Sequence, residues 1–268
     1  LDHDFIAGQC LWTGIDYLGE THGWPEHGSH AGLLTTAAFE KADYYLRQSW
    51  WTTRPMIKIA TCKADAGKWI GFRHLTLDYA QSEVFTAEVY SNLEDVELFQ
   101  GDVSLGRKQG RDENGRFTWQ VTQNEQPLRA VGYGTSDTGD IFTVQDELYP
   151  CGAPASLLVK MWDEELVADG KSVAQLEIRV LDDDGRVINT NQDMIEVSVE
   201  GEAKLLHMDN GDLGDITPYG ESKRKACGGC LMAYVQSTRY AGDVEVKVKL
   251  MTGTSEISNT ISLRTTAK

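Results

Sequence analysis

The sequence predicts a mainly β fold, with two immunoglobulin-like sandwiches after a short strand–loop–helix unit. Its 268 residues are 41% hydrophobic and 25% charged, which is typical of folded chains with two or three compact domains. After Trp51, short segments with period-two alternation recur about every ten residues and are separated by turn-forming stretches. A clear helical period occurs only before that point.

The first part of the chain, residues 1–53, predicts one strand, one long loop and one helix. The apolar run 5–12 is typical of a fully buried strand, and 37–51 has apolar residues at the helical period. Such a unit cannot bury both faces of its strand alone, so another part must cover it. Because the chain also starts without Met or a signal-peptide pattern, we expect a piece of a longer protein.

Residues 54–138 predict the first sandwich, and residues 139–268 predict the second. In 85–90, for example, Phe, Ala and Val alternate with Thr, Glu and Tyr, as in a strand with two different faces. The expected strands cover 85–92, 117–122, 128–133, the stretch 173–188 up to an Asp–Gly turn at 184–185, 195–201, 243–250 and 257–263.

The chain is strongly acidic, with 25 Lys and Arg against 41 Asp and Glu and a formal net charge of −16. Binding to nucleic acid or to an anionic membrane needs clustered cations, so this balance predicts neither partner. No apolar run approaches the roughly 20 residues of a transmembrane helix.

Several stretches resemble the bacterial β-galactosidase branch of glycoside hydrolase family 2. Residues 8–20 read GQCLWTGIDYLGE, and only Cys10 and Ile15 depart from the pattern that ends the family's catalytic barrel. The stretch VYSNLEDVELFQGDVSLGRK resembles the domain after the barrel, and CLMAYVQST resembles the last immunoglobulin-like domain. The resemblance covers nearly the whole chain, but 58–77 lacks the expected His-Trp-Asn-Trp.

The resemblance implies that residues 1–53 are the last strand and helix of a (β/α)8 catalytic barrel, the TIM-barrel fold. Family members hydrolyse β-glycosides with retention, using two glutamates whose carboxyl groups are about 5–5.5 Å apart. The resemblance places both glutamates on earlier strands, so we expect no catalytic residue in this chain and no activity from it alone. We also expect no cofactor.

The implied partners are the N-terminal part of the same enzyme and a β-linked carbohydrate. Homo-oligomers stay open, and the resemblance favours a periplasmic or secreted bacterial location. A different class of function is a stand-alone carbohydrate-binding or adhesive module of immunoglobulin-like domains. The first 53 residues distinguish the two functions, because a stand-alone module has no use for an unpaired barrel strand and helix.

Trp12 is the leading candidate for substrate binding. It lies near the end of the expected strand, where the active sites of these barrels form, and the resemblance implies that it lines the subsite of the cleaved sugar. An aromatic face suits a sugar because the ring's C–H groups pack on it; the alternative is a core tryptophan. Asp16, Glu20 and Trp24 are weaker candidates, since the two carboxylates more simply brace the loop.

Histidines and acids in the same loop suggest a metal site, but their spacing fits no zinc pattern. The residues concerned are His22, His27 and His30 with Glu20 and Glu26. We therefore expect a solvated loop there and no metal.

Two further motifs suggest metal or redox chemistry. Cys227 and Cys230 form a CxxC without a second CxxC or a nearby His pair, so chance, a local disulfide and a metal site all stay open. The Asp-rich stretches 181–185 and 207–215 offer oxygen ligands for calcium, although Asp–Gly turns explain them more simply.

Overall fold

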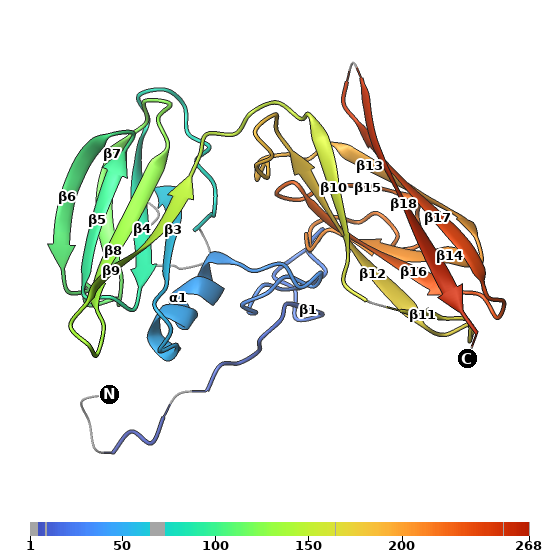
Figure 1. Ribbon diagram of the computed structural model, residues 1–268, viewed down its shortest axis with the longest axis horizontal. Coiled ribbons are helices and arrows are strands. Elements are labelled where there is room, and N and C mark those ends of the chain that lie inside the picture. Colours follow the sequence, from blue (N-terminus) through green and yellow to red (C-terminus); the bar gives the residue numbers. More distant parts are fainter. Residues whose placement is uncertain (1–4, 9, 65–72, 164, 254, 268) are drawn as a thin grey trace.

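The protein is described by a computed structural model that covers residues 5–8, 10–64, 73–163, 165–253 and 255–267. Two β-sandwiches lie side by side, and an N-terminal segment with the single described helix lies along them (Figure 1). The predicted mainly β class is confirmed. Among the described residues, no helix has the length and apolar content needed to cross a membrane.

The first sandwich consists of two antiparallel sheets, with strand orders β3-β4-β7 and β6-β5-β8-β9. Its strands are β3 (Ile57–Lys63), β4 (Val84–Ser91), β5 (Asp95–Gln100), β6 (Val103–Gln109), β7 (Phe117–Thr122), β8 (Leu128–Thr135) and β9 (Ile141–Leu148). Alternate side chains point inward, so Phe85, Val89, Leu98, Phe117 and Leu128 meet in one core.

Strand β9 corrects the predicted boundary between the sandwiches. The expected division at 138/139 falls in the hairpin between β8 and β9, and β9 pairs with β8 from Leu128↔Leu148 to Thr135↔Ile141. Only Leu148 of β9 is buried, because β9 is an edge strand; Phe142 and Val144 alternate with exposed residues but are only partly buried, and Asp146 interrupts the apolar pattern. The first sandwich thus extends to Leu148.

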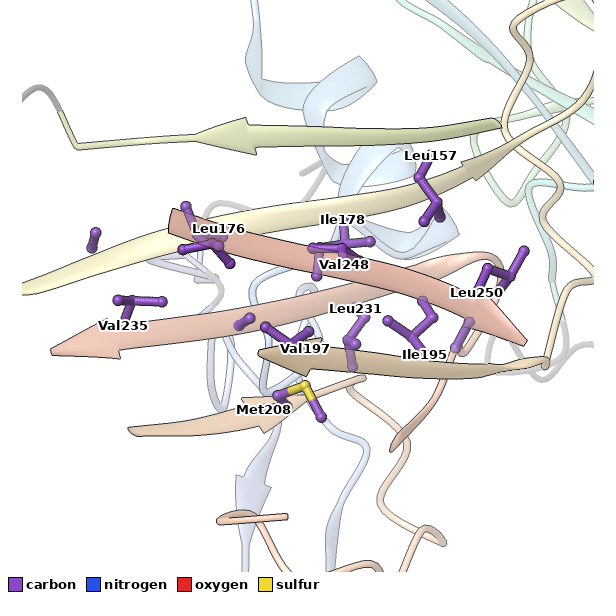
Figure 2. Close-up of a cluster of buried hydrophobic side chains, with 14 of the residues drawn as sticks. Leu157, Leu176, Ile178, Ile195, Val197, Met208, Leu231, Val235, Val248 and Leu250 are labelled. Carbon is purple, nitrogen blue, oxygen red and sulfur yellow. The ribbon is translucent and has the colours of Figure 1, made fainter. Parts of the chain in front are cut away.

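The second sandwich has sheets of order β10-β12-β16-β14 and β11-β18-β17-β13-β15. Its strands are β10 (Ser156–Met161), β11 (Leu166–Val167), β12 (Val173–Leu181), β13 (Met194–Gly201), β14 (Ala203–Asp209), β15 (Lys223–Lys225), β16 (Cys230–Ser237), β17 (Gly242–Met251) and β18 (Glu256–Thr266). Leu176 and Ile178 of one sheet and Val248 and Leu250 of the other belong to its buried core (Figure 2).

Helix α1 (Ala42–Trp51) begins later than predicted. The preceding residues form a turn in which Ala38 has a φ of 64°, outside the helical region. Leu46 of α1 packs with Ala60 and Tyr90 on the outer face of the β3–β4 pair. The helix therefore covers the face of β4 that points away from the sandwich core.

The buried strand predicted for 5–12 is not formed. The described residues of this stretch belong to no strand, and the side chains of Phe5 and Trp12 are 84% and 76% exposed. A strand needs hydrogen-bonding neighbours, and no described strand pairs with this stretch. The barrel-end unit implied by the resemblance is therefore not seen in this fold. The departure from the family pattern at 58–77 includes residues 65–72, which lie outside the described residues.

Glu88 is a buried carboxylate on the covered face of β4. Its Oε1 lies 3.0 Å from Arg73 Nη2 and 2.7 Å from Arg116 Nη1, and the Tyr90 hydroxyl donates to its Oε2 at 2.9 Å. Burial alone would raise the pKa of Glu88, but the hydrogen bonds and charges of the two arginines outweigh burial and lower this pKa. On the covered face of β4, the negative charge of Glu88 is thus compensated by the two arginines.

We expect Glu88→Gln to lower the free energy of unfolding by about 3–5 kcal/mol, because two buried arginines would lose their counter-charge. The folded-state pKa of Glu88 lies below its unfolded value of about 4.3, so its contribution is present above that pH and is lost as pH falls through the folded pKa. Urea denaturation from about pH 3 to 7 should show the difference from wild type shrinking in acid. The exposed Glu245→Gln is the matched control; an equally small, pH-independent effect of both variants would contradict the expectation.

Candidate substrate-binding site

Three side chains of the N-terminal segment are joined by hydrogen bonds. The indole Nε1 of Trp12 donates to the Tyr17 hydroxyl at 2.8 Å, and this hydroxyl donates to Oε2 of Glu20. The chain of bonds orients the Trp12 ring while leaving the residue 76% exposed. Tyr17 was not among the predicted site residues; its only signal in the sequence is its position between Trp12 and Glu20.

A small hairpin carries the loop that contains Glu20 and Trp24. Strand β1 (Tyr17–Leu18) pairs with β2 (Gly28–Ser29), and the Gly19 amide donates to the His27 carbonyl at 2.9 Å. Trp24 lies in this loop with 78% exposure. The segment therefore presents two indole rings to solvent, and one of them, that of Trp12, is linked to Glu20 through Tyr17.

Asp16 is buried beside the loop and binds it through hydrogen bonds. Its Oδ1 accepts hydrogen bonds from the Gly32 amide at 2.8 Å and from Lys41 Nζ at 3.0 Å. Lys41 Nζ also donates to the His30 carbonyl at 2.8 Å, so one ammonium joins two parts of the segment. The packing is tight, because a Cβ on Gly32 would lie 2.2 Å from the Asp16 backbone nitrogen. Both carboxylate oxygens of Asp16 thus accept hydrogen bonds within the segment, and these bonds hold the loop in place.

The histidines of the loop do not converge. His30 Nε2 lies 3.3 Å from Glu26 Oε1, His27 contacts the Pro25 carbonyl, and His22 is exposed. Within the described parts of the chain, no group of three or more His, Cys, Asp or Glu could hold a metal ion.

The Asp-rich stretches are turns with their oxygens already engaged. Asp182 accepts the amides of Asp184 and Arg186, and Asp215 is paired with the guanidinium of Arg224 at 2.9 Å. The bonds of Asp182, and that from the Thr217 amide to Asp215 Oδ1 at 2.9 Å, are those of Asx-type turns, in which the carboxylate accepts from a nearby backbone amide.

The loop 207–215 also holds the N-terminal segment on the second sandwich. The Thr36 hydroxyl donates to Asp209 Oδ1 at 3.1 Å, and the His27 amide donates to the Leu213 carbonyl at 3.1 Å. A Cβ on Gly211 would lie 2.6 Å from the Thr35 side chain, so the N-terminal segment and the loop after β14 are in close contact there. The sequence offered no signal for this contact.

A cavity of about 720 Å³ lies where the two sandwiches meet the N-terminal segment. Its wall includes Asp43, Arg179 and the three cysteines Cys151, Cys227 and Cys230. Asp43 Oδ1 is buried without a hydrogen-bond partner among the described residues, and burial raises the pKa of this carboxyl. None of Trp12, Asp16, Glu20 and Trp24 lines the cavity, so it is separate from the predicted substrate site.

Two family models match parts of the chain. Residues 157–256 match glycoside hydrolase family 2 C-terminal domain 5, and residues 82–138 match a domain of unknown function, DUF4982.

Two curated relatives are similar over most of the chain. The beta-galactosidase BoGH2A of Bacteroides ovatus is 30% identical over 257 residues, which is 95% of this chain and 28% of that protein. A putative beta-glucuronidase of Formosa agariphila is 29% identical over 231 residues, which is 84% of this chain and 21% of that protein. The chain therefore spans about a quarter of the length of these relatives.

Solved structures share the fold. A glycosyl hydrolase family 2 member from Bacteroides cellulosilyticus superposes with a TM-score of 0.82 at 23% identity, covering 96% of this chain and 35% of that one. A beta-glycosidase from Bacteroides vulgatus superposes with a TM-score of 0.77 at 27% identity, covering 94% of this chain and 30% of that one. The resemblance to glycoside hydrolase family 2 predicted from the sequence is confirmed, and residues 157–256 of this chain form a C-terminal domain of that family.

Proposed function

We propose that this chain is the C-terminal part of a retaining, β-galactosidase-like β-glycosidase, and that its N-terminal segment completes the sugar-binding pocket. The observation that carries the proposal is the exposed Trp12 ring, which Tyr17 and Glu20 orient within the stretch resembling the end of the family's barrel. A galactoside is the preferred substrate because the more similar of the two curated relatives is named a beta-galactosidase.

In this proposal the reacting glutamates come from outside the chain. A general acid or nucleophile must reach the glycosidic bond, and retaining enzymes hold two carboxyl groups about 5–5.5 Å apart for this purpose. Asp16 is unsuited to either catalytic role because it is buried and paired with Lys41. Glu20 instead accepts a hydrogen bond from the Tyr17 hydroxyl. The contribution of this segment is to bind and orient the sugar whose bond is cleaved.

The exposed stretch 5–12 fits the same proposal. The apolar side chains of its described residues are typical of a strand whose neighbours would be the adjacent barrel strands. Pairing with those strands would bury Phe5, which is 84% exposed in this fold. The two sandwiches would then support the barrel end through α1 and the loop 207–215.

The purified chain should not hydrolyse a chromogenic β-galactoside, because the proposal places both catalytic carboxylates elsewhere. Loss of one such group generally costs orders of magnitude in rate. The assay compares this chain with the full-length enzyme at equal molar concentration. Turnover by the chain at ordinary enzymatic rates, unchanged after repurification, would refute the proposal. Tight sugar binding by the chain alone, with an inactive full-length protein, would favour a carbohydrate-binding module instead.

In the full-length enzyme, Trp12→Ala should lower kcat/KM by about 10²–10³-fold, or roughly 2.7–4 kcal/mol of transition-state stabilisation. The physical reason is the loss of the aromatic face under the reacting sugar. Trp162→Ala is the matched control, because Trp162 is 57% exposed on the second sandwich and far along the chain from the site. Equal kinetics of the two variants would show that Trp12 has no platform role.

Tyr17→Phe in the same enzyme should cost about tenfold in kcat/KM, because the hydroxyl makes two hydrogen bonds and each contributes roughly 0.5–1.5 kcal/mol. The ring stays, but the hydroxyl that joins Trp12 to Glu20 is removed. Steady-state kinetics with the galactoside measure the effect. A variant as impaired as Trp12→Ala, or one without any defect, would contradict an orienting role.

A further inference from the structure

Cys227 and Cys230 face each other across a two-residue hairpin turn. The amide of each donates to the carbonyl of the other at 3.0 Å, and the two residues form an antiparallel bridge just before β16. Gly228 and Gly229 between them have φ values of 57° and 70°, the pattern of a type I′ turn. Residues opposite each other in such a hydrogen-bonded pair are about 5.5 Å apart at Cα and place their side chains on one face.

The Cα spacing of such a pair allows a disulfide, because disulfide-bonded cysteines have Cα atoms about 4.4–6.8 Å apart. The Cβ atoms of a hydrogen-bonded pair, about 4.5–5.5 Å apart, must move to within about 3.5–4.5 Å as the bridge closes. A metal site is less well supported, since no cluster of three or more ligands exists among the described residues. Of the three alternatives that the sequence left open, the hairpin therefore favours the disulfide.

We propose that Cys227 and Cys230 form a dithiol–disulfide site that closes across the hairpin when a small-molecule disulfide oxidises it. One cysteine thiolate attacks a sulfur of the small disulfide, which forms a mixed disulfide and releases one small thiol. The second cysteine then attacks the protein sulfur of the mixed disulfide, which closes the bridge and releases the second small thiol. Overall, two protein thiols lose two protons and two electrons, and the small disulfide gains them as it becomes two thiols.

The cavity gives an oxidant access to the pair. Both cysteines line the 720 Å³ cavity, and Cys227 is partly exposed while Cys230 is buried. Burial raises the pKa of each thiol to about 11, so little thiolate is present at neutral pH and closure should accelerate as pH rises. Cys151 lines the same cavity and is the competing partner that an experiment must distinguish.

The test uses the native chain with oxidised glutathione at about pH 8.5, where exchange is practical. Remaining thiols are alkylated in denaturant, and trypsin then releases peptide 226–239, which contains both cysteines and no other. We expect this peptide to lose two hydrogens and to resist alkylation. Cys62, buried in β3 and released in peptide 59–63, is the internal control and should stay alkylatable.

Three results would overturn the proposal. These are full alkylation of peptide 226–239 after prolonged oxidation, its cross-link to peptide 130–160 through Cys151, and a disulfide-linked dimer joined through Cys227 or Cys230 rather than through the exposed Cys10. Cys227→Ser and Cys230→Ser should each stop at the glutathione mixed disulfide or stay reduced. Because the wild-type peptide map decides the question, a folding defect of either variant leaves the test intact.

Discussion

Among the described residues, the buried cluster of the N-terminal segment is formed together with the first sandwich, because Ala42 and Leu46 of α1 pack with Ala60 and Tyr90. Leu46 of α1 is 1% exposed and packs on β3 and β4, and burial of such a side chain contributes about 1.5–3 kcal/mol. On the other side, Thr36 and His27 hydrogen-bond to the loop 207–215 of the second sandwich. One short segment therefore contacts both sandwiches, and the cavity lies where the three parts meet.

This contact has an electrostatic consequence for the first sandwich. A sheet in a sandwich normally has one solvated face, but α1 packs on Tyr90 on the outer face of β4, and Glu88 on the same face is buried. A buried carboxylate is costly without partners, and Arg73 and Arg116 supply them. The docked helix and the charge cluster therefore share one face of β4.

The sequence predicts the strands with strong alternation and misses those whose role depends on distant partners. The segment 117–122 was predicted with the bounds of β7, because Phe, Trp and Val alternate with polar residues there. Strand β9 was missed since its edge position leaves little apolar signal. The error at 5–12 has the opposite cause, because an apolar run records that a strand would be buried and not whether its neighbours are present.

The same limit applies to the sites. Trp12, Glu20 and Trp24 were recognisable by residue type and by the resemblance, whereas the linking role of Tyr17 depends on a hydroxyl position that no pattern encodes. The pairing of Asp16 with Lys41 spans 25 positions and is equally invisible. For the CxxC, spacing left three alternatives open, and only the turn between the cysteines showed that they face each other.

Hydrogen–deuterium exchange of α1 in the intact chain tests the central claim most directly, namely that the sandwiches hold the N-terminal segment in place. An isolated ten-residue helix would be marginal in water, so any strong protection must come from docking. If the sandwiches hold the segment, the interior amides of α1 should exchange nearly as slowly as those of β4. Exchange of α1 at the rate of an unstructured peptide, with β4 still protected, would contradict it.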